Sequence, residues 1–113
     1  MISQDLGSTD DLYLMANVRP KDSGLPFTVY ISEQQGPHDV WIKVASGSKV
    51  PQFVATVSVL PNVQVMEGEL SSREITLVRQ WIELNRDVIV GYWDRAIEST
   101  TDALAALKPI ERS

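Results

Sequence analysis

The feature that most constrains this chain is a change of hydrophobic periodicity at residues 67–71. Beyond it, apolar residues recur every three or four positions, and this spacing predicts one long amphipathic helix over residues 72–97. Ser71 and Glu74 have the spacing of a capping box, in which each side chain accepts a hydrogen bond from the other residue's backbone N–H. Residues 100–107, followed by Lys108-Pro109, predict a second, short helix.

The residues before this helix alternate apolar and polar positions in short runs at 27–32, 38–44, 53–60 and 63–66. A turn-like segment at 33–37 and a loop at 45–52 separate the first three runs. We therefore expect an α+β fold: an antiparallel meander of three to four strands, one long helix packed on the sheet, and a short C-terminal helix. Residues 15–98 are expected to form a single domain, preceded by a flexible extension at 1–14 and followed by a C-terminal segment at 99–113.

The apolar arc of the long helix covers about half of its circumference, wider than the ~100° stripe that a surface helix needs. One sheet face does not cover so wide an arc. The second cover is either the C-terminal segment, folding back through Leu104 and Leu107, or another molecule. On the second alternative, the interface residues are Trp81, Val88, Tyr92 and Trp93.

Two polar residues lie in or beside this arc. Asn85 is surrounded by apolar positions, and a buried amide without a partner costs about 1–3 kcal/mol. We therefore predict that Asn85 is buried and bonded to the backbone of a loop or an irregular strand end, with ligand or partner recognition as the alternative. Arg86 borders the arc, so its stem can lie on apolar surface while the guanidinium pairs with Glu83 or a strand carboxylate.

Composition excludes several classes of function. The chain has 113 residues, no cysteine and one histidine, so thiolate zinc sites and two-histidine metal sites from one copy are excluded. A formal net charge of -5 disfavours nucleic-acid binding. We predict neither a metal nor another cofactor. Without a secretory signal or a run of about 20 apolar residues, the expected location is the cytoplasm, with no membrane association.

Catalysis has little support in the sequence. No Gly-x-Ser-x-Gly elbow and no Gly-x-Gly phosphate loop occurs. The candidate catalytic residues are His38, which could act as a general base, and Asp39 or Glu33, which could orient it. The alternative is that His38 flanks a turn and faces solvent, and adjacent strand residues such as His38 and Asp39 point to opposite faces. The sequence therefore favours a protein that is not an enzyme.

The stretches Gly36–Val40 and Gly68–Trp93 resemble the small bacterial proteins grouped as domain of unknown function 4160. Members have a strand hairpin with a Pro-His-x-His-type motif, then a helix that ends near an asparagine–arginine stretch and a tryptophan. The matching positions are Pro37, His38, Asn85, Arg86 and Trp93. Val40 stands where the family has its second histidine, so the resemblance supplies no paired-histidine site here.

The resemblance implies a β-meander-plus-helix domain, a bacterial source and a gene neighbourhood like that of toxin–antitoxin pairs. Taken with the wide apolar arc, it favours a small protein-interaction domain that self-associates or binds a small protein partner. Such a domain would be one component of a toxin–antitoxin-like or regulatory two-protein module. The alternative is a small ligand-binding domain or hydrolase-like enzyme centred on His38.

Overall fold

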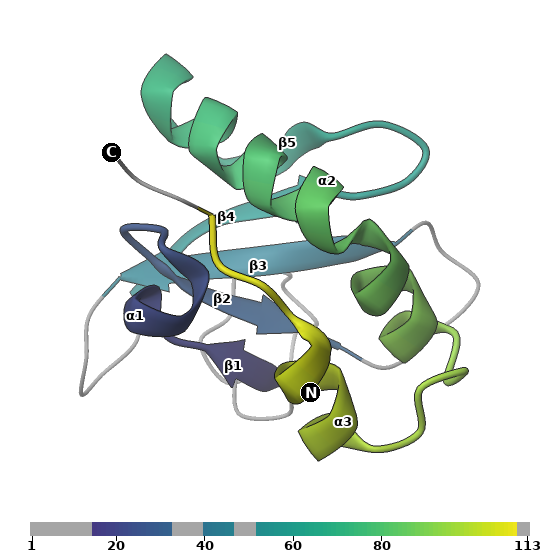
Figure 1. Ribbon diagram of the computed structural model, residues 1–113. Coiled ribbons are helices and arrows are strands. Elements are labelled where there is room, and N and C mark those ends of the chain that lie inside the picture. Colours follow the sequence, from purple (N-terminus) through teal and green to yellow (C-terminus); the bar gives the residue numbers. More distant parts are fainter. Residues whose placement is uncertain (1–14, 33–39, 47–51, 111–113) are drawn as a thin grey trace, which may run out of the picture.

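The computed structural model describes residues 15–32, 40–46 and 52–110, and the structural statements below concern these residues. They form two layers: an antiparallel sheet of five strands, and helix α2 (Ser72–Trp93), which lies across one face of that sheet (Figure 1). Two shorter helices are α1 (Pro20–Ser23) and α3 (Thr100–Ala106). The α+β prediction is confirmed, with five strands instead of three to four.

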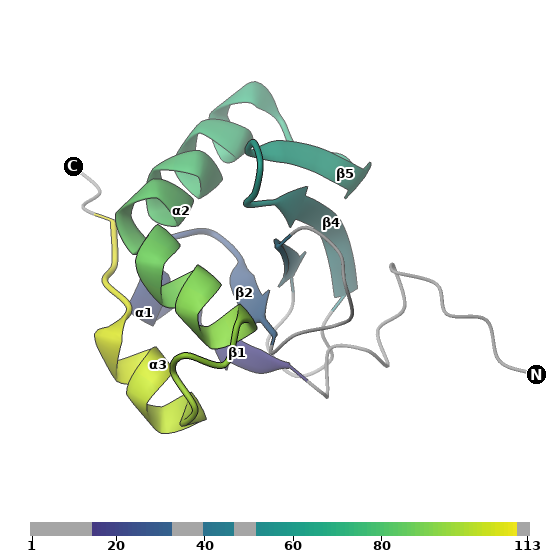
Figure 2. The same ribbon diagram turned by 90° about the vertical axis from the view of Figure 1, so that its right-hand side faces the viewer.

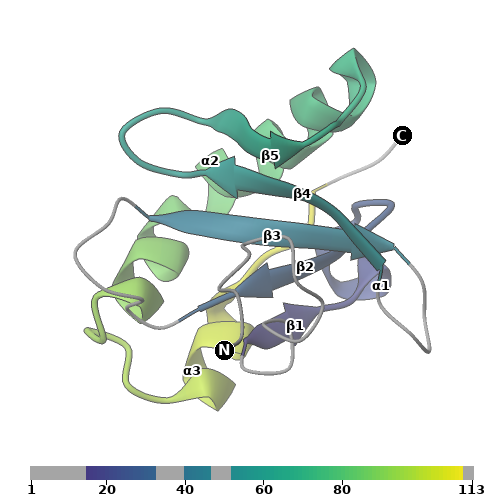
Figure 3. The ribbon, with the colours of Figure 1, turned by 180° about the vertical axis from the view of Figure 1, so that it is seen from behind.

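The sheet is a meander in which the strands lie side by side in chain order (Figure 3). All neighbours are antiparallel: β1 (Ala16–Val18), β2 (Thr28–Ile31), β3 (Trp41–Ser46), β4 (Gln52–Ser58) and β5 (Gln64–Gly68). The sequence did not predict β1, because three residues are too few to show a period of two. The segment 45–52 was predicted as a loop, but β3 continues through Ser46 and β4 begins at Gln52.

Helix α2 begins where the sequence predicts, since Ser71 is its N-cap and the capping box is formed. Its end differs from the prediction: it stops at Trp93 and not at Ile97. There the chain turns back, with Arg95 at a φ of 66° and the Ile97 N–H donating to the Gly91 carbonyl at 3.0 Å. The turn after α2 brings Ile97 back beside the helix. Ile97 is therefore partly buried although it is not helical, and this explains why its apolar side chain matched the helical spacing.

The face of the sheet toward α2, here called the front face, is apolar. Its residues alternate along the strands and lie opposite one another across them, as the register requires. Six of them, on the central strands, have no exposed surface: Val29, Ile31, Ile42, Val44, Ala55 and Val57. Each of the valine and isoleucine side chains contributes about 1.5–3 kcal/mol to folding when fully buried. The front face and α2 belong to one core.

The second cover over the wide apolar arc of α2 comes from the chain itself. Helix α3 flanks α2 on the β1 side of the molecule (Figure 2), and Ala103 of α3 is fully buried. The segment after α3 runs back alongside α2, and the Ile110 N–H donates to the Ser23 carbonyl of α1 at 2.9 Å. Of the two covers that the sequence left open, the structure shows the C-terminal segment. Leu107 packs against the core as predicted, whereas Leu104 is exposed and Ala103 takes the buried position.

Within the described part of the chain, none of the helices combines the length and the apolar character needed to span a bilayer.

Candidate functional site

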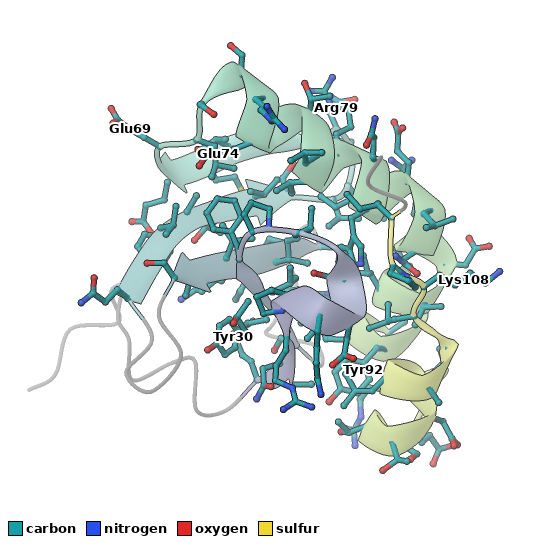
Figure 4. The ribbon with its side chains drawn as sticks, turned by 60° about the vertical axis from the view of Figure 1, so that its left-hand side comes forward. Tyr30, Glu69, Glu74, Arg79, Tyr92 and Lys108 are labelled. Carbon is teal, nitrogen blue, oxygen red and sulfur yellow. The ribbon has the colours of Figure 1, made fainter. Side chains whose placement is uncertain are left out.

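The three aromatic residues that were predicted to form an interface are buried in the protein core. Trp81 has no exposed surface, and Tyr92 and Trp93 are buried as well. The Trp93 ring meets the Trp41 ring of β3 edge to face, with centroids 5.2 Å apart. The Tyr92 hydroxyl lies 2.7 Å from the Thr100 hydroxyl of α3, which places this phenol between the two helices (Figure 4). These rings are therefore packed by the protein's own elements.

Other residues on the same side of α2 remain accessible. Val88, the fourth predicted interface residue, is half-buried. Leu84, one turn before it, is 49% exposed. An interface on this flank stays a prediction, and it would use these aliphatic side chains and not the tryptophans.

Asn85 joins α2 to the C-terminal segment. It is 2% exposed, and its Nδ2 donates to the Trp81 carbonyl at 3.0 Å and to the Lys108 carbonyl at 2.9 Å. Its Oδ1 accepts from the Lys108 N–H at 2.7 Å. The amide thus bonds the Lys108 backbone as a neighbouring strand would. The Asn85 amide and the Lys108 backbone N–H and carbonyl are therefore all hydrogen-bonded. We call this pair of hydrogen bonds between Asn85 and Lys108 the clamp, because it holds the C-terminal segment against α2.

The other polar residues singled out by the sequence have separate surroundings. Glu74 Oε1 accepts from the Ser71 N–H at 2.8 Å, and Ser71 Oγ accepts from the Glu74 N–H at 3.1 Å. Arg86 is half-buried, and its Nε is enclosed without a hydrogen-bond partner among the described residues. The structure does not bring Ser71 and Glu74 together with Asn85 in one site, because they lie at different positions along α2.

A feature that the sequence analysis did not identify is a polar row on the back face, the face opposite α2. The register places Tyr30 opposite Lys43, Lys43 opposite Thr56, and Thr56 opposite Glu67, so the row crosses four strands. Lys43 has no exposed surface, and its Nζ lies 5.6 Å from the centroid of the Trp41 ring and 5.9 Å from that of Phe53. The row is visible only when the register is known.

The end of this row at β5 has unsatisfied hydrogen-bonding capacity. Thr56 Oγ1 and Glu67 Oε1 are both enclosed, and neither has a hydrogen-bond partner among the described residues. A buried polar atom without a partner costs about 1–3 kcal/mol, so both atoms are unfavourably placed in this arrangement. Glu67 lies on the outermost strand, which makes it the member of the row nearest the sheet edge.

Strand β5 itself is an edge. Its inner side pairs with β4, and no described strand pairs with its outer side. The register shifts at Met66, which is 49% exposed. An edge of this kind presents backbone N–H and C=O groups to a further strand. Beyond β5, Glu69 and Glu74 are two acidic residues on the surface next to the start of α2 (Figure 4).

The candidate catalytic residues Glu33, His38 and Asp39 lie outside the described residues. Among the residues that the structure does describe, no group of three or more His, Asp or Glu side chains is arranged to hold a metal ion.

No curated protein and no solved structure shows significant similarity to the chain. One protein family matches, over residues 24–94, and it carries the description domain of unknown function (DUF4160). The match spans more than half of the chain, from just before β2 to the end of α2. Its limits enclose β2 to β5 and α2, while β1 and α3 lie outside. On this match, the protein is a member of the DUF4160 family.

Proposed function

We propose that this protein is an interaction domain that binds an extended, basic segment of a protein partner by strand addition at β5. The observation that carries the proposal is the outer edge of β5, which no described strand occupies in an otherwise continuous sheet. Strand addition uses backbone hydrogen bonds for affinity and alternate side chains for specificity. The partner would be the second component of a toxin–antitoxin-like or regulatory two-protein module.

Side chains on β5 supply the specificity. A strand added to this edge would extend the polar row by one position, beside Glu67. Cross-strand neighbours have Cβ atoms about 4.5–5.5 Å apart, so a side chain of the added strand would lie beside Glu67. A lysine, an arginine or a hydroxyl residue there would bond the Glu67 carboxylate once it turns toward the added strand, which also gives a partner to Oε1, an enclosed atom without one among the described residues. The exposed Met66 offers an adaptable apolar contact.

Charge favours a basic segment over a second copy of this chain. Glu67 is on the edge strand, Glu69 follows it, and the whole chain carries a formal net charge of -5. Two β5 strands paired with each other would bring these carboxylates together, and like charges close together are destabilising. A cationic segment meets the same carboxylates with the opposite sign, which also accelerates association.

The test uses two synthetic peptides of equal length, one alternating Lys with Val and the other alternating Glu with Val. Each is titrated into the isotopically labelled full chain, and backbone amide shifts are followed by NMR. The basic peptide is expected to shift and protect residues 64–68. Glu67→Gln should weaken its binding about tenfold, as a charge-assisted hydrogen bond is lost. Glu98→Gln, an exposed acid outside β5, serves as the matched control and should leave binding unchanged.

Three results would contradict the proposal. One is equal binding of both peptides, and another is a shift pattern that omits β5. The third is a dimer in sedimentation whose β5 amides are protected without any peptide, because the edge would then belong to a second copy.

A further inference from the structure

A pocket of about 530 Å³ lies at one end of the strands, where β1 leads through Arg19 into α1. Its remaining walls come from the start of β2 and the end of β3, which the register pairs at Thr28 and Ala45. Pockets that bind small molecules measure about 300–1,000 Å³. The volume therefore suits a compact organic molecule.

Two cationic side chains line this pocket, Arg19 and Lys21, and no acidic residue lies among its described lining. Arg19 approaches Asp22, with Nε 3.7 Å from Oδ2, but both side chains are more than half exposed. A solvent-exposed pair of this kind contributes about 0–1 kcal/mol, so it does not hold the guanidinium strongly. In a chain of net charge -5, this is a local concentration of positive charge.

The rest of the lining is mainly apolar. Its apolar residues are Pro20, Pro26, Phe27 and Ala45, of which Ala45 has no exposed surface, and Thr28 and Ser46 carry hydroxyl groups. Phe27 and Ala45 are themselves buried, so this wall is fixed by the core. An apolar wall with a few polar groups is the usual composition of a small-molecule site.

We propose that this pocket binds a small carboxylic acid with an apolar or aromatic body. The carboxylate would pair with the Arg19 guanidinium, which matches its planar, two-oxygen geometry, and Lys21 would add a second positive charge. The apolar body would lie against Phe27 and Pro26. A phosphate shares the anionic chemistry, but it lacks the apolar body that this wall accommodates.

Lys21 also lines a second pocket of about 340 Å³ on the side of α1 toward α3, together with Asp22 and Leu107. Arg19 lines the larger pocket and is not among the residues of the smaller one. Arg19 is therefore the residue whose substitution reports on the proposed site. Its side chain makes no capping hydrogen bond to α1, so Arg19→Gln is expected to leave that helix in place.

The test titrates phenylacetate, 2-phenylethanol and inorganic phosphate separately into the labelled full chain and follows backbone amide shifts by NMR. Phenylacetate is expected to give saturable shifts at Phe27, Thr28 and Ala45. The neutral alcohol and phosphate should each bind at least about tenfold more weakly, since each lacks one of the two interactions. Arg19→Gln should weaken phenylacetate about tenfold. Arg79→Gln, an exposed arginine on α2 (Figure 4), should have no effect.

Each other result overturns the proposal. Equal binding of the alcohol would show an apolar site without anion recognition, and equal or tighter binding of phosphate would show an anion site without the apolar wall. Absence of saturable shifts with phenylacetate, or equal binding to the Arg19→Gln protein, would also refute it. Because no β5 residue is among the described lining of the pocket, failure here is distinguishable from failure of strand addition.

Discussion

The two edges of the sheet differ in what lies beside them. Strand β1 has three residues, and α3 packs against it while the C-terminal segment is bonded to α1 next to it. Strand β5 has five residues, and its outer side has no described neighbour in the sheet. Among the described residues, the C-terminal segment therefore lies beside one edge of the sheet, while no strand lies beside the other. Edge strands that remain open are sites of pairing with other chains.

Two glycines, one near each edge, differ in which part of the chain lies against them. Gly24 follows α1 near the β1 edge, and Gly68 ends β5; both have positive φ, at 82° and 83°. A Cβ at Gly68 would lie 2.0 Å from the Val54 carbonyl oxygen and 2.8 Å from the Ala55 Cα. A Cβ at Gly24 would lie 2.6 Å from the Ile110 carbonyl oxygen. The first obstacle is a central strand, and the second is a segment near the end of the chain.

The largest expected effect is that of Gly68→Ala. A left-handed alanine costs about 1–2 kcal/mol, and here the backbone of β4 must also move. We expect the free energy of unfolding to fall by about 3 kcal/mol or more. Urea denaturation measures this loss. A decrease below about 1 kcal/mol would show that β5 can shift away from β4, contrary to a fixed edge.

The next effect is that of Asn85→Leu, which removes the clamp on the C-terminal segment. Leucine is similar in size, but it leaves the Lys108 N–H and carbonyl without the partners that Asn85 provides. The expected loss is about 2–3 kcal/mol in unfolding free energy, with faster hydrogen exchange at the Lys108 amide. Gln80→Leu, at an exposed position of the same helix, is the matched control and should stay within about 0.5 kcal/mol. Unchanged exchange at Lys108 would contradict the clamp.

Gly24→Ala should have a smaller effect than Gly68→Ala, although both residues share the same backbone conformation. We expect about 1–2 kcal/mol, most of it the cost of the left-handed conformation, because the obstacle is Ile110, which follows the part of the C-terminal segment that Asn85 holds. The Ile110 amide should exchange faster, since its bond to the Ser23 carbonyl is the contact displaced. If the two alanine variants lose equal stability, β4 and the C-terminal segment resist displacement equally, which would contradict the difference expected between the two edges.

The smallest effect is expected at the start of α2, next to β5. Ser71→Ala removes the hydroxyl that accepts from the Glu74 N–H, and the loss of such a cap costs about 1 kcal/mol. Ser72→Ala, one residue into the helix, is the control and should be nearly neutral. Thermal unfolding of the two variants compares them directly. Equal melting temperatures would mean that the cap does not stabilise this end of the helix.

Local patterns predicted the local structure well. The capping box and the 3.6-residue period placed the start of α2 at Ser72, because both signals lie within the helix itself. The helix end was misplaced because Ile97 stays in phase with the helix while packing through a turn. The strand β1 was missed because its evidence is its pairing with β2 and not its own three residues.

The candidate sites were harder to predict for the same reason. The tryptophans of α2 gave the same signal whether they meet a partner or the protein's own core, and the structure places Trp81 and Trp93 in the core. Lys43 and Thr56 are polar residues within strands, and nothing in the sequence aligns them with Tyr30 and Glu67. Only strand register brings these four side chains into one row.

The amino-acid sequence by itself determined the class of fold, the order of the meander and helix, the cap at Ser71 and the need of Asn85 for a backbone partner. These follow from periodicity, spacing and the cost of an unpaired amide, which depend on neighbours along the chain. The tertiary structure alone decided which backbone Asn85 holds, which edge of the sheet has no described strand beside it, and which apolar residues line a pocket together with Arg19. Those outcomes depend on contacts between residues far apart in sequence, which the spacing of residues along the chain does not predict.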